Sequence, residues 1–202
     1  VIVEAAAEIG VKHLTLYTFS TENWKRPKEE VSTLMTLLVR TLRKEINELH
    51  KNNVRLNTIG DFSALPKTVQ EEFTDAIEKT SKNSKLNLHL ALSYSGRWEI
   101  LEAVKKLAAD VQSGSLHPSA INDILFSDYL ATKGIPDPEL LIRTSGEFRV
   151  SNFLLWQIAY SEIYICDEFW PDFKKQNLID AIANFQKRER RFGKVSEQLK
   201  KK

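Results

Sequence analysis

The chain has 202 residues, of which 42% are hydrophobic and 28% are charged, and its formal net charge is +2. Length and composition are typical of one soluble globular domain with a full core. The near-neutral charge gives no support for a nucleic-acid partner. A single cysteine, Cys166, excludes an internal disulfide framework and a cysteine-cluster metal site. No apolar run approaches the roughly 20 residues that a membrane-spanning helix needs.

The first half of the chain alternates between helix and strand patterns. The opening VIVEAAAEIG reads as a helix over 1–9 that is already under way, so we expect the natural chain to begin upstream. The residues that follow predict a strand at about 11–18 and then a loop at STENWKRP. Apolar residues at three- and four-residue spacings predict a long helix over 28–51. VRLNTIG predicts a strand, and Pro66 opens a helix at about 66–81.

The second half continues the alternation. LNLHLALSY is apolar enough to be a central strand. We expect helices at about 97–112 and from Pro118 to about 130, strands at ELLIR and SEIYIC, a turn at WPDF, and a terminal helix over QNLIDAIANFQKRERRFG. The pattern predicts an α/β fold, with a single domain over 1–193, a largely parallel central sheet flanked by helices, and a charged tail at 194–202.

The segment STENWKR combines hydroxyl, carboxylate, amide, indole and guanidinium groups. One interpretation is a helix N-terminal loop, in which Ser20 or Thr21 is the capping residue and Glu22 is solvated. The other is a polar wall of a ligand site, which a tryptophan exposed in a loop favours. These residues alone leave both interpretations open.

A second polar segment, IRTSGEFRVSNF, places Arg143 and Arg149 beside three hydroxyl groups and Gly146. Guanidiniums bind phosphate or carboxylate in a bidentate way, and hydroxyls with backbone N–H groups near a glycine complete an anion cradle. The alternative is that both arginines pair with Glu147 and Glu162. Because ligands bind at the carboxyl ends of parallel strands, we expect both polar segments on one rim, where three arginines suit a diphosphate. The P-loop pattern of nucleotide triphosphate sites is absent.

Glu162 follows the arginine segment in AYSEIY. A carboxylate beside a diphosphate site suits Mg²⁺, which binds one or two protein carboxylates together with phosphate oxygens. A structural salt bridge between Glu162 and Arg143 is the alternative. The basic run KRERR is either a solvated helix face or a source of charge for a phosphate or a partner subunit.

The histidines and the cysteine indicate neither a metal site nor a nucleophilic catalyst. We expect Cys166 to be buried rather than nucleophilic. The four histidines lie singly on strands and loops with no metal-cluster spacing, and we expect them to be structural or surface residues: His13, His50, His89 and His117.

Five segments, in the same order as in the family, resemble the cis-prenyltransferases of the undecaprenyl diphosphate synthase type: FSTENWKRP, SYSGRWEI, LLIRTSGEFRVSNFLLWQIAYSEIY, WPDF and RERRFG. The resemblance covers essentially the whole chain. It implies a Mg²⁺-dependent prenyltransferase that extends an allylic primer such as farnesyl diphosphate with isopentenyl diphosphate units. Each new double bond is cis, and the product is a long polyprenyl diphosphate that serves as a lipid carrier in cell-wall and peptidoglycan synthesis.

The same resemblance implies the setting of the reaction. The family is homodimeric and has a hydrophobic tunnel for the growing chain, whose walls we expect to be the 28–51 helix and LNLHLAL. Since the product is a membrane lipid, we expect a cytoplasmic enzyme that visits the inner face of the plasma membrane to release it.

The resemblance also assigns roles to single residues. Glu162 matches the magnesium-binding glutamate. Asn23 matches a position often given as the catalytic proton acceptor, although a carboxamide is a poor base and suits orienting the substrate or relaying a proton better. The remaining substrate-binding positions fall in the two polar segments and are Ser20, Thr21, Glu22, Trp24, Arg26, Arg143, Arg149, Val150 and Ser151.

One family motif, a strand-end Asp-Gly-Asn segment followed by Arg and Trp, is absent from these 202 residues. It carries the family's other metal-binding aspartate, so we expect it upstream of Val1 and expect a protein of this extent alone to be inactive. Phe148 stands where relatives have polar residues.

Three rival functions are a different diphosphate-using transferase, a non-catalytic partner subunit and an anion-binding module. The presence of Asn23 and Glu162 with the arginines argues against the second.

Overall fold

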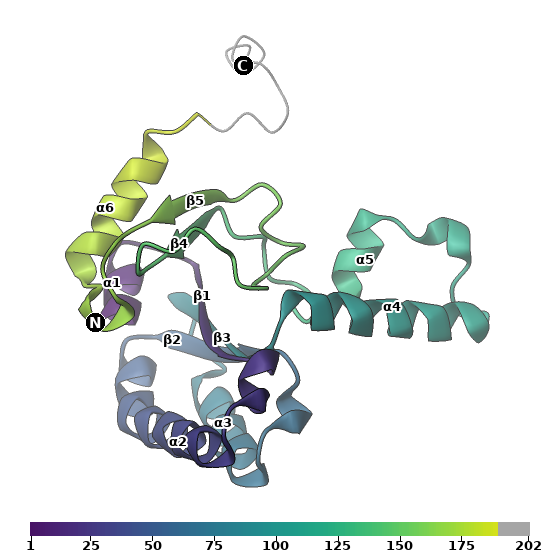
Figure 1. Ribbon diagram of the computed structural model, residues 1–202, viewed down its shortest axis with the longest axis horizontal. Coiled ribbons are helices and arrows are strands. Elements are labelled where there is room, and N and C mark those ends of the chain that lie inside the picture. Colours follow the sequence, from purple (N-terminus) through teal and green to yellow (C-terminus); the bar gives the residue numbers. More distant parts are fainter. Residues whose placement is uncertain (190–202) are drawn as a thin grey trace. The chain divides into compact units, whose positions relative to one another are not determined.

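The computed structural model describes residues 1–189. The chain divides into two compact units. The larger unit comprises Val3–Pro136 and Asn152–Leu154, and the smaller unit comprises Val1–Ile2, Asp137–Ser151 and the chain from Leu155 onward. Helices and strands alternate, and every strand pair is parallel, so the predicted α/β class is confirmed (Figure 1). The strands nevertheless form two sheets and not a single central one, since β1, β3 and β2 pair among themselves and β4 pairs with β5.

The sheet of the larger unit has the order β1-β3-β2. These strands are His13–Ser20 (β1), Val54–Ile59 (β2) and Leu86–Tyr94 (β3). Adjacent residues of a strand point to opposite faces, and Leu88 and His89 are each only 3% exposed. Both faces of β3 are therefore covered, which confirms the prediction that LNLHLALSY is a central strand.

Three helices accompany this sheet: Ile2–Glu8 (α1), Lys28–Lys51 (α2) and Lys67–Thr80 (α3). α2 and α3 lie side by side (Figure 1). Their buried residues include Met35 and Leu42 of α2 and Val69 and Phe73 of α3. Each such side chain contributes about 1.5–3 kcal/mol when it is fully buried, and the spacing of apolar residues that predicted both helices arises from this burial.

The end of β2 approaches β3 unusually closely. Gly60 has φ +117°, and a Cβ at this position would lie 2.1 Å from the Leu92 carbonyl oxygen. Only glycine allows this approach. The next residue, Asp61, then donates its N–H to the Ser93 carbonyl at 3.1 Å, which fixes the backbone at the carboxyl end of β3.

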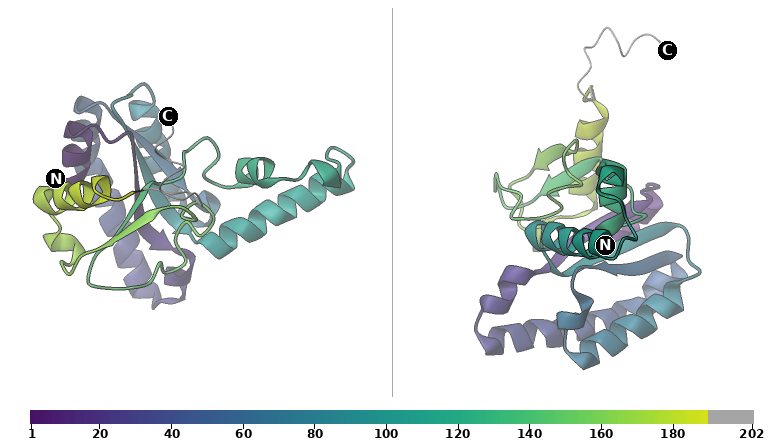
Figure 2. Two further views of the ribbon diagram at one scale, coloured as in Figure 1. Left: turned by 90° about the horizontal axis from the view of Figure 1, so that it is seen from above. Right: turned by 90° about the vertical axis from the view of Figure 1, so that its right-hand side faces the viewer.

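The remaining helices of this unit are Gly96–Gln112 (α4) and Asp123–Tyr129 (α5), which lie alongside each other (Figures 1 and 2). The single helix expected from Pro118 is divided in two. A 3-10 turn, Pro118–Ala120, comes first. The side chain of Asn122 then accepts a hydrogen bond from the Leu125 N–H at 2.9 Å and caps a new helix.

In the smaller unit, Leu140–Arg143 (β4) and Glu162–Ile165 (β5) form a two-stranded sheet, and Lys175–Gln186 (α6) packs on both strands. The expected WPDF turn is a 3-10 turn, Trp170–Asp172. α6 ends earlier than the predicted terminal helix. The rest of that predicted helix from residue 190, and the predicted tail at 194–202, lie outside the described residues. Within residues 1–189, no helix is long and apolar enough to cross a membrane.

Candidate functional site

The STENWKR segment is a short 3-10 helix, Thr21–Lys25 (η1), directly after β1, and not a loop. The cap bond runs from the Ser20 backbone N–H to Oδ1 of Asn23 at 2.8 Å. Ser20 is the N-cap residue, as the capping interpretation expected, and the side chain that accepts this bond belongs to Asn23. This bond fixes the orientation of the Asn23 carboxamide.

Two side chains of η1 are bound to the carboxyl end of β3. The indole Nε1 of Trp24 donates to Oγ of Ser93 at 2.9 Å, and the hydroxyl of Thr21 donates to Oγ of Ser95 at 2.8 Å. Phe19 packs edge-on against the Trp24 ring, with ring centroids 4.8 Å apart. The expectation of an exposed tryptophan is thus wrong, because Trp24 is half-buried and its polar atom is satisfied.

A third contact binds the carboxylate of η1. Glu22 accepts a hydrogen bond from Nδ2 of Asn152 at 2.7 Å, and Asn152 accepts in turn from the N–H groups of Gly96 and Arg97. Burial alone would raise the pKa of Glu22, but hydrogen bonds, led by that from Asn152, outweigh it and lower the pKa. The nearby Tyr17 has a pKa raised to about 12, mainly by burial and then by the charge of Glu22. Glu22 is therefore an exposed anion, as one interpretation expected, whose carboxylate is also held by Asn152.

These anchoring residues, Ser93, Ser95 and Asn152, were not singled out from the sequence. The only signal for them is the placement of small hydroxyl residues in SYSG, immediately after an apolar strand, and of an asparagine after Ser151.

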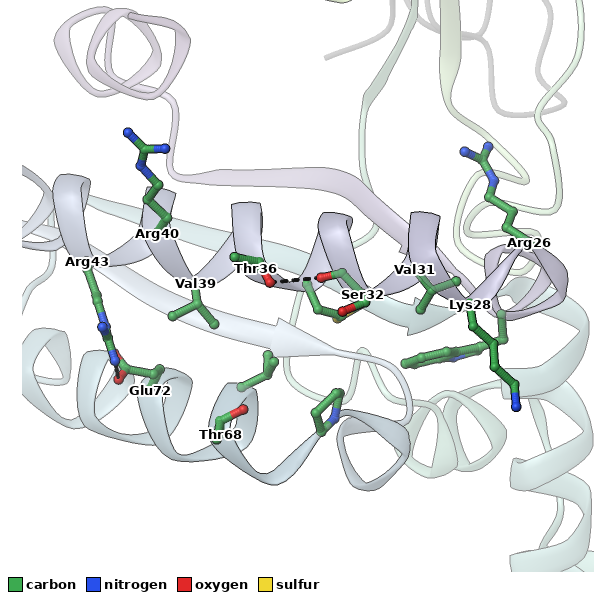
Figure 3. Close-up of a pocket in the computed structure, with 14 residues that line it drawn as sticks. Arg26, Lys28, Val31, Ser32, Thr36, Val39, Arg40, Arg43, Thr68 and Glu72 are labelled. Carbon is green, nitrogen blue, oxygen red and sulfur yellow. Dashed lines mark hydrogen bonds and ion pairs between the residues drawn. The ribbon is translucent and has the colours of Figure 1, made fainter.

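A cavity of about 780 Å³ lies between α2 and α3, with Arg26 and Lys28 at one end (Figure 3). Its volume is in the range of ligand pockets. α2, one of the two expected tunnel walls, lines this cavity together with residues of α3, and LNLHLAL contributes no lining residue. The apolar lining residues are Trp24, Val31, Met35, Val39, Pro66 and Val69, and the cationic ones are Arg26, Lys28, Arg40 and Arg43.

Two of these cations are paired with carboxylates. Arg26 contacts Glu30 at 2.6 Å, and both side chains are about half exposed. Arg43 of α2 forms an ion pair with Glu72 of α3, at the far end of the cavity from Arg26 (Figure 3). The cavity therefore offers an apolar body with cationic groups at its edges, which suits an anionic molecule with a long hydrocarbon part.

The smaller unit carries the other two arginines. Arg143 ends β4, and its Nε is buried without a hydrogen-bond partner among residues 1–189. A buried donor without a partner costs about 1–3 kcal/mol. Arg149 is exposed and pairs with Glu147, as one interpretation of the sequence expected. Since Arg26 lies in the other unit, the common rim for all three arginines stays a prediction.

Two backbone N–H groups of this segment are already used within the protein. Ser145 and Gly146 have positive φ values of 69° and 64°. Their N–H groups donate to the carbonyls of Glu168 and Cys166, both at 2.8 Å. The expectation that backbone donors near Gly146 bind an anion is wrong for these two groups, and the side chains remain as the candidate ligands.

Glu162 begins β5 and pairs with Arg188 at 2.7 Å, not with Arg143. Arg188 also donates to the Ile163 carbonyl at 3.0 Å, so the basic run extending from Lys187 supplies at least one cation next to the predicted metal ligand. No group of three or more histidine, cysteine or acidic side chains gathers anywhere in residues 1–189. Glu162 is therefore the single acidic side chain of this predicted metal site within residues 1–189, and Mg²⁺ accepts one or two protein carboxylates together with phosphate oxygens.

The prediction of isolated histidines is wrong for one pair. His13 Nδ1 and His89 Nε2 share a hydrogen bond of 3.1 Å, because β1 and β3 are neighbours and Thr15 pairs with His89. The prediction for Cys166 is confirmed. It is 8% exposed, and burial and then the charge of Glu168 raise its pKa, which disfavours the thiolate.

Comparison with known proteins decides the family. The family model Prenyltransf, described as "Putative undecaprenyl diphosphate synthase", matches residues 1–193. The chain belongs to this family. The undecaprenyl diphosphate synthase family consists of prenyltransferases, so the expectation of a prenyltransferase enzyme is confirmed, and membership implies a divalent metal in general.

Curated relatives agree with the family. The chain is 53% identical over 199 residues to an isoprenyl transferase of Chlorobaculum tepidum, and the match covers 98% of this chain and 75% of the relative. It is 46% identical over 197 residues to the ditrans,polycis-undecaprenyl-diphosphate synthase ((2E,6E)-farnesyl-diphosphate specific) of Aliivibrio fischeri, covering 98% of this chain and 77% of the relative.

Two solved structures of this family type have the same fold. Lavandulyl diphosphate synthase from Lavandula x intermedia, in complex with dimethylallyl diphosphate, matches with a TM-score of 0.92 and 37% identity, over 96% of this chain and 84% of that chain. A probable undecaprenyl diphosphate synthase from Campylobacter jejuni matches with a TM-score of 0.84 and 38% identity, over 95% and 89%.

Proposed function

We propose that this protein condenses successive isopentenyl diphosphate units onto farnesyl diphosphate, in the cis configuration, to make undecaprenyl diphosphate as a lipid carrier for cell-wall synthesis. The observation that carries the proposal is the family match over residues 1–193, which includes both polar segments. Relatives of Aliivibrio fischeri and Haemophilus influenzae bear the name of this activity. The test is to incubate the full-length protein with labelled isopentenyl diphosphate, farnesyl diphosphate and Mg²⁺ and to size the lipid product. A short or unlabelled product would contradict the proposal.

In this reaction the allylic C–O bond breaks and its electron pair leaves with the diphosphate. The double bond of isopentenyl diphosphate supplies the electrons of the new C–C bond, and a proton then leaves the condensed unit. Arg143 and Arg149 hold the second diphosphate so that this double bond faces the allylic carbon, with Val150 and Ser151 completing the contact. Holding two reactants in this way can lower the barrier by several kcal/mol. The position of Arg143 at the carboxyl end of the parallel strand β4 supports this role.

Asn23 orients the homoallylic substrate in this proposal. Its carboxamide is fixed by the hydrogen bond from Ser20, and as a neutral group it is a poor base at pH 7. It therefore guides the departing proton toward a diphosphate oxygen instead of keeping it. Ser20, Thr21 and Glu22 shape the surrounding surface.

Glu162 is the proposed magnesium ligand, and a bound Mg²⁺ would stabilise negative charge on diphosphate oxygens. Glu162 must then exchange its contact with Arg188 for the ion. Both side chains are about one-third exposed, and partly exposed ion pairs of this kind contribute little free energy. Replacing this contact therefore costs little free energy, and the released Arg188 remains nearby as a cation for a phosphate.

The growing isoprenoid lies in the cavity between α2 and α3 in this proposal, with Trp24 and Arg26 at its entrance. Each buried methylene contributes about 0.8 kcal/mol, so an apolar cavity favours every added unit. The lining side chains Val31, Met35, Val39 and Val69 supply this surface.

The protein is a homodimer in this proposal, and α4 offers the surface. Leu101 and Val104 are 59% and 49% exposed and lie on one face of the helix, with Ala108 one turn further. Ile124 of the adjacent α5 is 76% exposed. Apolar side chains clustered on the surface in this way mark an interaction site, and a second copy of the same helix face would cover them.

The remaining expectations belong to the same proposal. Residues 1–193 are one catalytic domain, because the family match runs across both compact units. The enzyme works in the cytoplasm and meets the inner face of the membrane only to release its product. Arg143, Arg149 and Asn23 together favour this catalytic reading over a non-catalytic subunit.

A further inference from the structure

Two buried serines bind the substrate segment η1 to the sheet. Ser93 and Ser95, named here the β3 serines, are each 2% exposed and lie at the carboxyl end of β3. Their hydroxyl oxygens accept hydrogen bonds from Trp24 and Thr21, and these two residues match substrate-contacting positions of the family.

The β3 serines lie on a rigid part of the fold. Tyr94 between them is fully buried, and its hydroxyl donates to the carboxylate of Glu99 at 2.7 Å. Glu99 is 2% exposed and also accepts from the Ala131 N–H at 2.9 Å. Burial and then the charge of Glu99 raise the pKa of Tyr94, so its hydroxyl keeps the proton that it donates to Glu99. The hydroxyl groups of Ser93 and Ser95 are therefore held in place beside a buried, hydrogen-bonded side chain.

The backbone at Ser93 is strained. Its φ is +49°, a left-handed conformation that non-glycine residues rarely adopt and that costs roughly 1–3 kcal/mol. Glycine would relieve this strain, and asparagine tolerates the conformation better than most residues. Serine at this position therefore costs more conformational free energy than glycine would. What serine adds is a hydroxyl oxygen 2.9 Å from the Trp24 indole nitrogen.

We propose that Ser93 is a positioning residue for the prenyl transfer, acting through Trp24, and that Ser95 supports it through Thr21. The inference rests on the proposed function. Trp24 lines the cavity between α2 and α3 beside Arg26. Fixing the indole by its nitrogen sets which ring edge faces the cavity, and hence where the allylic end of the substrate rests.

Three variants separate this role from a purely structural one. Ser93→Gly removes the acceptor and relieves the backbone, whereas Ser93→Asn keeps an acceptor oxygen and tolerates the backbone. Trp24→Phe keeps an aromatic ring and removes the donor. If Ser93 served only the backbone, the glycine variant would equal or exceed wild type. Ser115→Gly is the matched control, because Ser115 is exposed and lies outside the site.

The experiment measures kcat and KM for farnesyl and isopentenyl diphosphates, together with thermal unfolding, in the full-length enzyme. We expect Ser93→Gly to lower kcat/KM by about 10-fold, because the Trp24 indole is no longer held in place. Thermal stability should change little, since the relieved backbone strain offsets the lost hydrogen bond. Ser93→Asn should recover most of the activity. Because Ser93 acts through Trp24, the double variant Ser93→Gly with Trp24→Phe should be no worse than Trp24→Phe alone.

Two results would overturn the inference: wild-type kinetics for Ser93→Gly, or losses that simply add in the double variant. If asparagine is too large for the site, unfolding of that variant will show it, and the double-variant comparison still decides. Wild-type protein without turnover would instead refute the proposed function, and the role of Ser93 with it.

Discussion

Protonation of His89 should lower the free energy of unfolding already at pH 5, above the pH range in which most carboxylates titrate. His89 is 3% exposed and its pKa is lowered from 6.5 to about 4, by burial first and then by the charge of His13. A histidine with a lowered pKa stabilises the folded state above the unfolded pKa. That stability is lost as the pH falls below 6.5 toward 4. The full loss for a shift of this size is about 3 kcal/mol.

The magnitude at an accessible pH follows from the same two values. At pH 5 the unfolded imidazole is mostly protonated and the folded one mostly neutral, so the loss relative to pH 7 is about 2 kcal/mol. Urea unfolding at both pH values gives this difference for wild type and for His89→Gln. The glutamine variant should lose about 2 kcal/mol less than wild type. His50→Gln, at an exposed position of α2, is the control. Equal pH dependence in wild type and His89→Gln would refute the reasoning.

Three further predictions concern the proposed site and surface. Arg149→Ala should raise KM for isopentenyl diphosphate by at least 10-fold, as loss of a charged contact worth about 1.5–3 kcal/mol requires; an unchanged KM in steady-state kinetics would contradict the assignment. Glu162→Gln should raise the Mg²⁺ concentration needed for half-maximal rate, and a metal titration with an unshifted midpoint would exclude Glu162 as a ligand. Leu101→Asp with Val104→Asp should convert dimer to monomer in analytical ultracentrifugation, while an unchanged mass would place the dimer contact elsewhere.

The elements with strong periodicity could be predicted from the sequence. α2 and β3 were correct in type and close in extent, because one apolar stripe and one doubly buried strand leave clear patterns. The division into two sheets was not predictable, because pairing between strands is a matter of register and not of any one strand's composition. The helix at Pro118 was divided for a local reason, the Asn122 cap, which an isolated asparagine signals only weakly.

The site was predicted in its parts but not in its connections. Arg149 with Glu147 is a local contact that neighbouring residues suggest. The bonds from Trp24 to Ser93 and from Thr21 to Ser95 join residues 69 and 74 positions apart. They exist because Ser20 pairs with Tyr94 in the β1–β3 register, which brings η1 against the end of β3. The same neighbouring strands unite His13 with His89, which the sequence showed as isolated residues.

Two arginines of the proposed site, Arg26 and Arg149, can readily exchange a nearby carboxylate for a substrate diphosphate. Arg26 and Arg149 each contact a carboxylate only a few residues away, and these pairs are largely exposed. Such pairs are worth about 0–1 kcal/mol, whereas a diphosphate offers several charged oxygens and bidentate geometry to the same guanidiniums. The local carboxylates therefore orient the two guanidiniums but do not compete effectively with a substrate diphosphate for them. Arg143 differs, because its Nε is buried without a partner in residues 1–189. A diphosphate oxygen can reach this Nε only if the side chain or its cover moves, so Arg143, unlike Arg26 and Arg149, must rearrange before this nitrogen can bind substrate.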